Sequence, residues 1–247
     1  MRRILEAIVP SARSLVPDRN VYKVAVYKAI ASASESIRRR RNEDPSSISD
    51  IQAAIYLTQT LQREWQRVPC RISVEFSVNP RDEADASMGI TGDTYHIDKE
   101  HTLRKVIVWL PIRNALAVLI GKPKFLSSEV LATLDHEFVH VQQEAATKQP
   151  SHGNDRMAYL MDEDELEAFV EETAHRLVDA FGSEAYGLIV TRDPVMWACI
   201  RDSIWIVREV YTKLKPADAI KFFLAMRDRV KALLSTGSAQ RIASWAD

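Results

Sequence analysis

The hydrophobic positions of the first 67 residues have the period of amphipathic helices, in two successive segments. The first segment, from Asn20 to Arg41, has apolar residues at positions 21, 24, 25, 29 and 37. The second follows an NEDPSS loop, where Ser49 or Asp50 can cap a helix that runs to about Trp65. The apolar face of this second segment contains one polar residue, Thr58. The face consists of Ile51, Ala54, Ile55, Thr58, Leu61 and Trp65. The pattern predicts two N-terminal helices within about 20–67.

The pattern then changes to the period of two that is typical of strands. Alternate positions are apolar in residues 71–78, RISVEFSV, and nearly all positions are apolar in residues 105–112, KVIVWLPI. The long, charged connection 79–103 between these runs is expected to contain a short strand near Tyr95. These runs predict a small sheet of two or three strands.

A short helical piece and then a longer helix are expected after the second apolar run, the longer one capped near Ser127 or Ser128. At about 100° per residue, one arc of this helix has core-type spacing and consists of Leu131, Leu134, Phe138 and Val141. His136, Glu137 and His140 occupy the roughly opposite arc. The same helix therefore offers a buried face and a face that can carry chemistry.

Three more helices are predicted in the last third of the chain. The first spans 162–181, after a loop at 148–160, and the others lie near 195–213 and 217–234. Pro194 and Pro216 mark the starts of the last two, because proline is favoured in the first turn of a helix.

About six helices and two or three strands predict an α+β fold dominated by helix, with a small sheet next to the helix of residues 131–145. We expect a single domain over 1–247, in which the helices of 20–67 and 195–234 pack on a core of about 70–181.

Composition and charge exclude several classes of protein. A net charge of −1 gives no general attraction to nucleic acid or to an anionic membrane, and the seven glycines form no nucleotide-binding motif. Cys70 and Cys199 are far apart and are expected to be reduced thiols, as in the cytosol. We find no signal peptide and no apolar run long enough to cross a bilayer. The sequence therefore predicts a soluble cytoplasmic protein with no membrane or nucleic-acid partner.

Four consecutive arginines, Arg38 to Arg41, are the one feature that could suggest nucleic-acid binding. Acidic Glu43 and Asp44 follow at once, and no aromatic residues are interleaved. We favour the interpretation that these cations lie in solvent at a helix C-terminus, where they interact favourably with the helix dipole.

The strongest chemical signal is H-E-x-x-H, residues His136 to His140. Side chains four apart on a helix lie one turn apart on the same side, so two imidazoles can converge on one metal ion. The alternative is a chance pair of surface histidines on an amphipathic helix. A catalytic zinc usually takes three protein ligands and leaves a position for water, so a third ligand is needed. The carboxylate-rich segment MDEDELEAFVEE, residues 161–172, offers candidates.

This combination resembles the gluzincin metallopeptidases, in which H-E-x-x-H is followed on a later helix by a glutamate ligand in an E-x-x-A or E-x-E-A-D setting. Residues 165–168, ELEA, match E-x-E-A, and HEFVHVQQ resembles small bacterial and phage members. The resemblance covers about 105–177. It departs from the family at Phe169, where an aspartate is often found, so Glu171 or Glu172 would have to orient one histidine instead.

The resemblance implies that Glu165 is the third ligand of a Zn²⁺ ion. Glu167 is a competitor, and Glu165 could instead act in a capping box with Asp162. No third histidine stands where a metzincin would have one, because position 146 is alanine.

The predicted function is zinc-dependent hydrolysis of peptide bonds in a peptide or protein substrate. Glu137 would be the general base that takes a proton from the attacking water. The resemblance further implies that the strand at 105–111 borders the cleft and pairs with an extended substrate. Tyr159 and His152 are candidates for stabilising the oxyanion, although packing or solvent exposure is the simpler reading of each.

A non-catalytic protein that keeps this fold as a protein-interaction module is the alternative function. Trp197, Ile204 and Trp205 could form a partner surface, although a buried core is the expected role of these residues. An intact H-E-x-x-H with its glutamate favours the enzyme, because a degenerate copy need not keep Glu137.

Overall fold

The computed structural model describes residues 16–44, 47–70, 72–79, 91–96, 104–143, 162–191, 197–198, 200–201 and 204–236. The chain divides into two compact units, Met1–Gln142 and Gln143–Asp247, and each is described here by itself. Helices dominate, with one small sheet, so the α+β prediction is confirmed at that level. One domain over 1–247 stays a prediction. Within the described ranges, no helix combines the length and the apolar character that crossing a bilayer requires.

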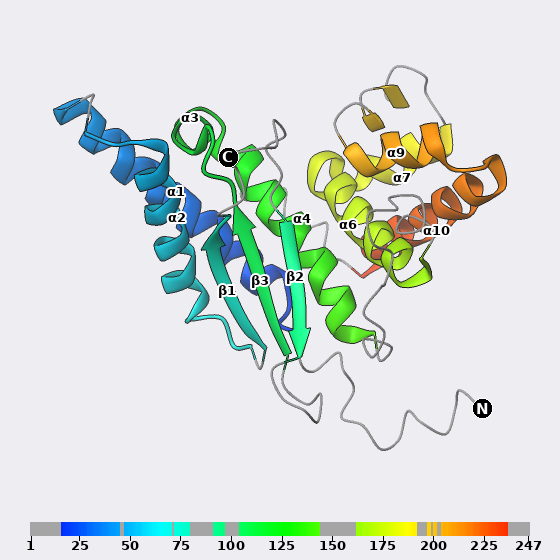
Figure 1. The fold of residues 1–247 in the computed structure, drawn as a ribbon. Coiled ribbons are helices and arrows are strands. Elements are labelled where there is room, and N and C mark those ends of the chain that lie inside the picture. Colours follow the sequence, from blue (N-terminus) through cyan, green and yellow to red (C-terminus); the bar gives the residue numbers. More distant parts are fainter. Residues whose placement is uncertain are drawn as a thin grey trace. The chain divides into compact units, whose positions relative to one another are not determined.

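The first unit contains four described helices and three described strands (Figure 1). In chain order these are α1 (Arg19–Glu43), α2 (Asp50–Trp65), β1 (Ser73–Val78), β2 (Thr91–His96), β3 (Arg104–Leu110), α3 (Ala115–Gly121) and α4 (Pro123–Gln142). The predicted N-terminal helices and strands are all present, including the short strand near Tyr95, which is β2.

The strand order in the sheet is β1-β3-β2. β3 is parallel to β1, with Ser73 opposite Lys105, and antiparallel to β2, with Thr91 opposite Trp109. Because β3 has a neighbour on both sides, its backbone has no free edge for a further strand. The prediction that the strand at 105–111 pairs with an extended substrate is therefore wrong. β2 occupies the edge position that had been expected for the strand at 105–111.

The outer edge of β1 is closed by a side chain of α2. The Gln62 amide donates from Nε2 to the Val74 carbonyl at 3.1 Å, and its Oε1 accepts from the Phe76 N–H at 3.0 Å. A primary amide has the same donor and acceptor as a peptide unit, so it replaces the bonds of a neighbouring strand. Gln62 thereby blocks the backbone groups that would otherwise pair with another chain.

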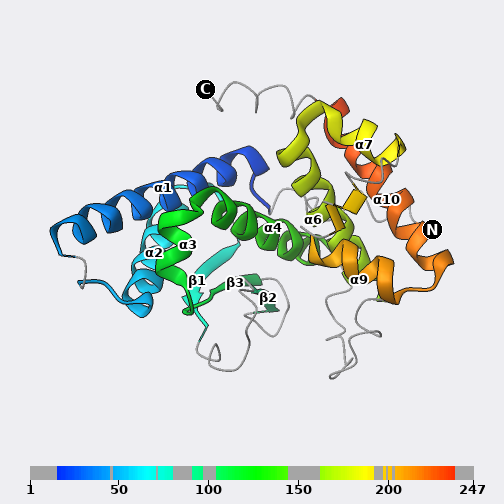
Figure 2. The ribbon, with the colours of Figure 1, turned by 90° about the horizontal axis from the view of Figure 1, so that it is seen from above.

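The helices of the first unit form two layers over one face of the sheet. α2 packs on β1, α4 packs on β2 and β3, and α1 contacts α2 and α4. Figure 2 shows α1 on the side of α4 that faces away from the strands. The aromatic rings of Tyr22, Trp65, Phe76 and Phe138 meet in the core between these elements, with centroids 5.2–6.1 Å apart.

The buried faces of α1 and α2 differ in part from the predicted stripes. On α1, Val21 and Val24 are exposed, and the core face is formed by Tyr22, Val26, Ala29, Ile30, Ala33 and Ile37. On α2, Ile51 and Ile55 are exposed, whereas Ala54, Thr58, Leu61 and Trp65 are buried as expected. Several alanines on these helices are fully buried while larger valines and isoleucines are exposed, so the size of an apolar residue did not mark the buried side.

The predicted caps were correct for α2 and wrong for α4. Ser49 caps α2 in a capping box, its Oγ accepting from the Gln52 N–H and the Gln52 Oε1 accepting from the Ser49 N–H. α4 begins at Pro123, four residues before the predicted cap. Proline suits the first position of a helix, and the buried Ser127 hydroxyl donates back to the Pro123 carbonyl.

The arginine run ends α1 as predicted, with its side chains largely exposed. The Arg38 guanidinium donates to the Ile120 carbonyl, and Arg39 forms an ion pair with Glu35 at 3.3 Å. The Arg40 guanidinium carbon lies 5.4 Å from the centroid of the Tyr56 ring. These side chains therefore connect α1 to its neighbours in addition to carrying charge.

The second unit is helical in its described part. Its elements are α6 (Glu163–Phe181), the 3-10 helix η3 (Gly182–Glu184), α7 (Ala185–Thr191), α9 (Trp205–Lys213) and α10 (Pro216–Ser235). The helices at 162–181 and 217–234 are confirmed, and Pro216 lies in the first turn of α10. α7 was not predicted. The helix expected over 195–213 is interrupted at Ile204, whose backbone is extended, with φ −113° and ψ 104°.

A separate apolar core holds these helices together, with α6 packed on α10. Ile204 is buried in this core, and the partly buried Trp197 ring lies 5.4 Å from Phe223 in an edge-to-face contact. Both observations support a core role for Ile204 and Trp197. The side chain of Trp205 lies outside the described residues.

An ion cluster joins α6 to α10. The Glu171 carboxylate accepts hydrogen bonds from His175 Nε2, at 2.9 Å, and from the Arg229 guanidinium. Burial raises the pKa of Glu171, but the hydrogen bonds and charges of His175 and Arg229 outweigh it and lower that pKa to about 2. His175 is itself buried.

Candidate metal centre

α4 presents the three motif residues on the face that the helical period predicted. Leu131, Leu134, Phe138 and Val141, on the opposite arc, are all buried in the core of the first unit. His136 is 7% exposed and Glu137 is 5% exposed, while His140 is partly buried. A pair of solvated surface histidines, the alternative considered from sequence, does not fit this burial.

The two imidazoles point at each other. His136 Nε2 lies 3.1 Å from His140 Nε2, and the ring planes are inclined at 75°. Two nitrogens bound to one tetrahedral zinc at its usual bond length are roughly 3.3 Å apart. The histidine pair therefore fits a metal ion with little rearrangement.

A buried acidic residue fixes the start of the motif. Asp135, directly before His136, accepts three hydrogen bonds from the Arg19 guanidinium at 2.8–3.1 Å, and one from the Tyr22 hydroxyl. Its side chain is 1% exposed. Because a buried carboxylate is costly unless it is paired, these contacts hold the N-terminal end of α1 against α4 at the motif.

Sequence reasoning missed this anchor. The first predicted helix begins at Asn20, after Arg19, and the sequence motif gave Asp135 no role. The available signal was a charged residue between Leu134 and His136 on the strongly apolar motif helix, where a buried acid needs a cationic partner.

The predicted third ligand, Glu165, belongs to the second unit and lies in the first turn of α6, where it is 6% exposed. The cap of α6 is made without it, since the Asp162 carboxylate accepts from the Asp164 N–H at 2.9 Å. Its competitor Glu167 is exposed and accepts a hydrogen bond from Gln143 Nε2 at 3.1 Å. Burial therefore favours Glu165 over Glu167.

The two acids suggested as orienting groups have partners within the second unit. Glu171 is held by His175 and Arg229, and Glu172 accepts from Arg176 at 3.1 Å. Glu172 lies two turns from Glu165, close to the same face of α6, whereas Glu171 lies on another face. Of the two acids, Glu172 is therefore the one that shares a face of α6 with Glu165.

By their chemistry, His136, His140 and Glu165 could hold a metal ion. Two neutral imidazoles and one carboxylate are a common ligand set for zinc and suit other divalent transition metals. The candidates for oxyanion stabilisation, His152 and Tyr159, lie outside the described residues.

Comparisons with known proteins found no similar chain. No family model matches the sequence, and no curated protein and no solved structure matches it. The function is therefore inferred from the residues and their geometry.

Proposed function

We propose that this protein is a zinc-dependent metallopeptidase of the gluzincin type. The observation that carries the proposal is the pair of Nε2 atoms of His136 and His140, which lie 3.1 Å apart on one helix. Glu137, which follows His136 in the sequence, is buried on the same helix. Two imidazoles aimed at one point with a neighbouring carboxylate are the minimal parts of a metal-assisted hydrolase.

In this proposal, His136 and His140 bind the metal through Nε2, and Glu165 of α6 supplies the third ligand. The burial of Glu165 supports this choice. When bound, zinc supplies a Lewis acid that lowers the pKa of water to about 7 and polarises a carbonyl group.

Glu137 acts as the general base. Its carboxylate takes a proton from the attacking water and passes it to the leaving amine. Glu137 is 5% exposed, so little bulk water reaches its carboxylate. Asp135 does not share this role, because Arg19 and Tyr22 hold it on another face of α4.

The peptide substrate is proposed to bind in an extended form beside β2. β2 is the edge strand next to α4, whereas β3 is central and the outer edge of β1 is closed by Gln62. Extended peptides commonly bind by adding a strand to the edge of a sheet.

Three variants on α4 test the proposal. Glu137→Gln should retain one equivalent of zinc and lose cleavage of casein by at least about 100-fold, because it keeps the ligands and removes the base. His140→Ala should lose both zinc and cleavage. Glu129→Gln, a partly buried glutamate two turns earlier on the same helix, is the matched control and should retain both.

Zinc content is measured by plasma emission spectroscopy, and cleavage with and without a chelator. Wild-type protein without stoichiometric metal would overturn the proposal. Zinc-loaded protein that cleaves neither casein nor a peptide library would favour the alternative, a metal-binding interaction module.

A further inference from the structure

A cavity at the C-terminal end of α1 has the chemistry of a small-molecule site. It has a volume of about 200 Å³ and lies between α1, α2 and the segment joining them. Its lining combines one cation, several uncharged polar side chains and aliphatic groups, namely Ile37, Arg40, Ser47, Ile48, Gln52, Ile55, Tyr56 and Gln59. None of these residues belongs to the motif on α4, so this site is independent of the proposed peptidase centre.

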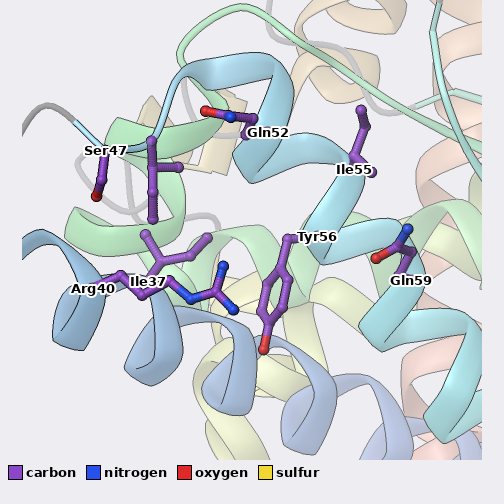
Figure 3. Close-up of a pocket in the computed structure, with 8 residues that line it drawn as sticks. Ile37, Arg40, Ser47, Gln52, Ile55, Tyr56 and Gln59 are labelled. Atoms are coloured by element: carbon purple, nitrogen blue, oxygen red, sulfur yellow. The ribbon is translucent and has the colours of Figure 1, made fainter.

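Arg40 is positioned to bind an anion. Figure 3 shows its side chain extending from α1 toward the Tyr56 ring on α2, and the guanidinium carbon lies 5.4 Å from the ring centroid. This cation–π contact needs no N–H donor, so the N–H groups of the guanidinium remain for a ligand. Among the residues that the structure describes, no acceptor is hydrogen-bonded to this guanidinium.

Gln52 provides a second donor at the cavity. Its Oε1 is used in the cap of α2, where it accepts from the Ser49 N–H at 2.8 Å. This bond fixes the side chain and leaves the Nε2 amino group for another acceptor. In the part of the chain described here, Nε2 makes no hydrogen bond.

The rest of the lining defines the size and charge of the ligand. Among the described residues that line the cavity, none is acidic and Arg40 is the one with a charge. The single positive charge of Arg40 balances a monoanion, and the in-plane donors of the guanidinium match the two oxygens of a carboxylate. Ile37, Ile48 and Ile55 offer contacts to an aliphatic group.

We propose that this cavity binds a small apolar monocarboxylate. The carboxylate accepts hydrogen bonds from the Arg40 guanidinium and the Gln52 amide, and the aliphatic part of the ligand covers the three isoleucines. The volume suits a ligand smaller than a typical drug, for which we expect a Kd of about 1 mM.

The probes are 4-methylpentanoate, its neutral amide 4-methylpentanamide, and inorganic phosphate. Each is titrated into metal-free, ¹⁵N-labelled full-length protein, and binding is read from the Arg40 Nε–H signal and the Gln52 side-chain amide signals. Metal-free protein is used so that carboxylate binding to a metal at His136 and His140 makes no contribution. The proposal expects saturable shifts with 4-methylpentanoate and at least about tenfold weaker binding of the other two probes.

Two variants and a control make the test specific. Arg40→Met should weaken binding of 4-methylpentanoate at least about tenfold, because it removes the cation and keeps an apolar side chain of similar length. Gln52→Glu should do the same by charge repulsion, while its carboxylate still accepts from Ser49 and preserves the helix cap. Arg39→Met, next in sequence but paired with Glu35 outside the cavity, should bind as the wild type does.

Retained amide dispersion in each spectrum establishes that a variant is folded. The proposal is overturned if 4-methylpentanoate gives no saturable shift, if the amide or phosphate binds as tightly, or if Arg39→Met weakens binding as much as Arg40→Met. It is also overturned if Gln52→Glu, which keeps the fold and the cap, binds the carboxylate with unchanged affinity.

Discussion

Replacement of Glu171 by glutamine should destabilise the second unit by an amount that depends on pH. In the folded protein, burial raises the pKa of this carboxyl, and the stronger opposing effect of His175 and Arg229 brings it from an ordinary 4.5 to about 2. At roughly 1.4 kcal/mol for each pH unit, this lowering corresponds to about 3 kcal/mol of stability at neutral pH. The Glu171 side chain is 20% exposed, so solvent screening reduces this figure only moderately.

The sign follows from proton binding. Because the pKa of Glu171 is lower in the folded state, the unfolded chain binds more protons as the pH falls. The contribution of the Glu171 carboxylate to the free energy of unfolding is therefore fully present above about pH 5. It is lost as the pH falls from there toward 2. The stability difference between wild type and Glu171→Gln should therefore be about 2–3 kcal/mol at pH 7 and should shrink steadily below pH 5.

The measurement is urea denaturation followed by hydrogen exchange of peptides from α6 and α10, which reports on the second unit alone. Arg229→Gln should lower the free energy of unfolding of the second unit by a similar amount at pH 7. Arg227→Gln, whose partner is the adjacent and exposed Asp228, is the matched surface control and should change stability by less than about 0.5 kcal/mol. A loss in Glu171→Gln that is equal at pH 7 and pH 3, or no larger than in the control, would refute the reasoning.

Three further predictions concern the motif and the sheet. Glu165→Ala should weaken zinc binding at least about 100-fold in a chelator competition, against less than about threefold for Glu167→Ala; equal losses would reassign the third ligand. Arg19→Met removes the cationic partner of the buried carboxylate before the motif and should lower the free energy of unfolding by about 3 kcal/mol; a loss below about 0.5 kcal/mol would contradict the anchor. Gln62→Leu should cost about 2 kcal/mol and increase self-association in light scattering, whereas Gln66→Leu at the exposed end of α2 should do neither.

Local patterns predicted much of the fold. The capping residues fixed the start of α2, because Ser49 and Gln52 satisfy each other's backbone groups without help from the rest of the chain. The period of 3.6 placed Phe138 in the core and His136 on the other face of α4, since one helix determines that relation.

Relations between distant segments could not be predicted in the same way. The central place of β3 depends on the order in which three strands pair, and the apolar residues of β3 alone do not determine which strands lie beside it. The exposure of Val24, at 60%, depends on which side of α1 meets its neighbours. The partner of Asp135 is 116 positions earlier in the sequence, so no window of the sequence could identify Arg19.

The contacts at the two ends of α1 affect how this helix opens. An ordinary helix frays from its termini, where backbone groups lack partners and few side chains restrain them. In α1, the first turn is tied down by Arg19 and Tyr22 on Asp135, and the last turns by Arg38 on the Ile120 carbonyl. A helix of roughly 37 Å that is fastened at both ends cannot unwind stepwise from either one, so its opening requires the collapse of the packing beneath it.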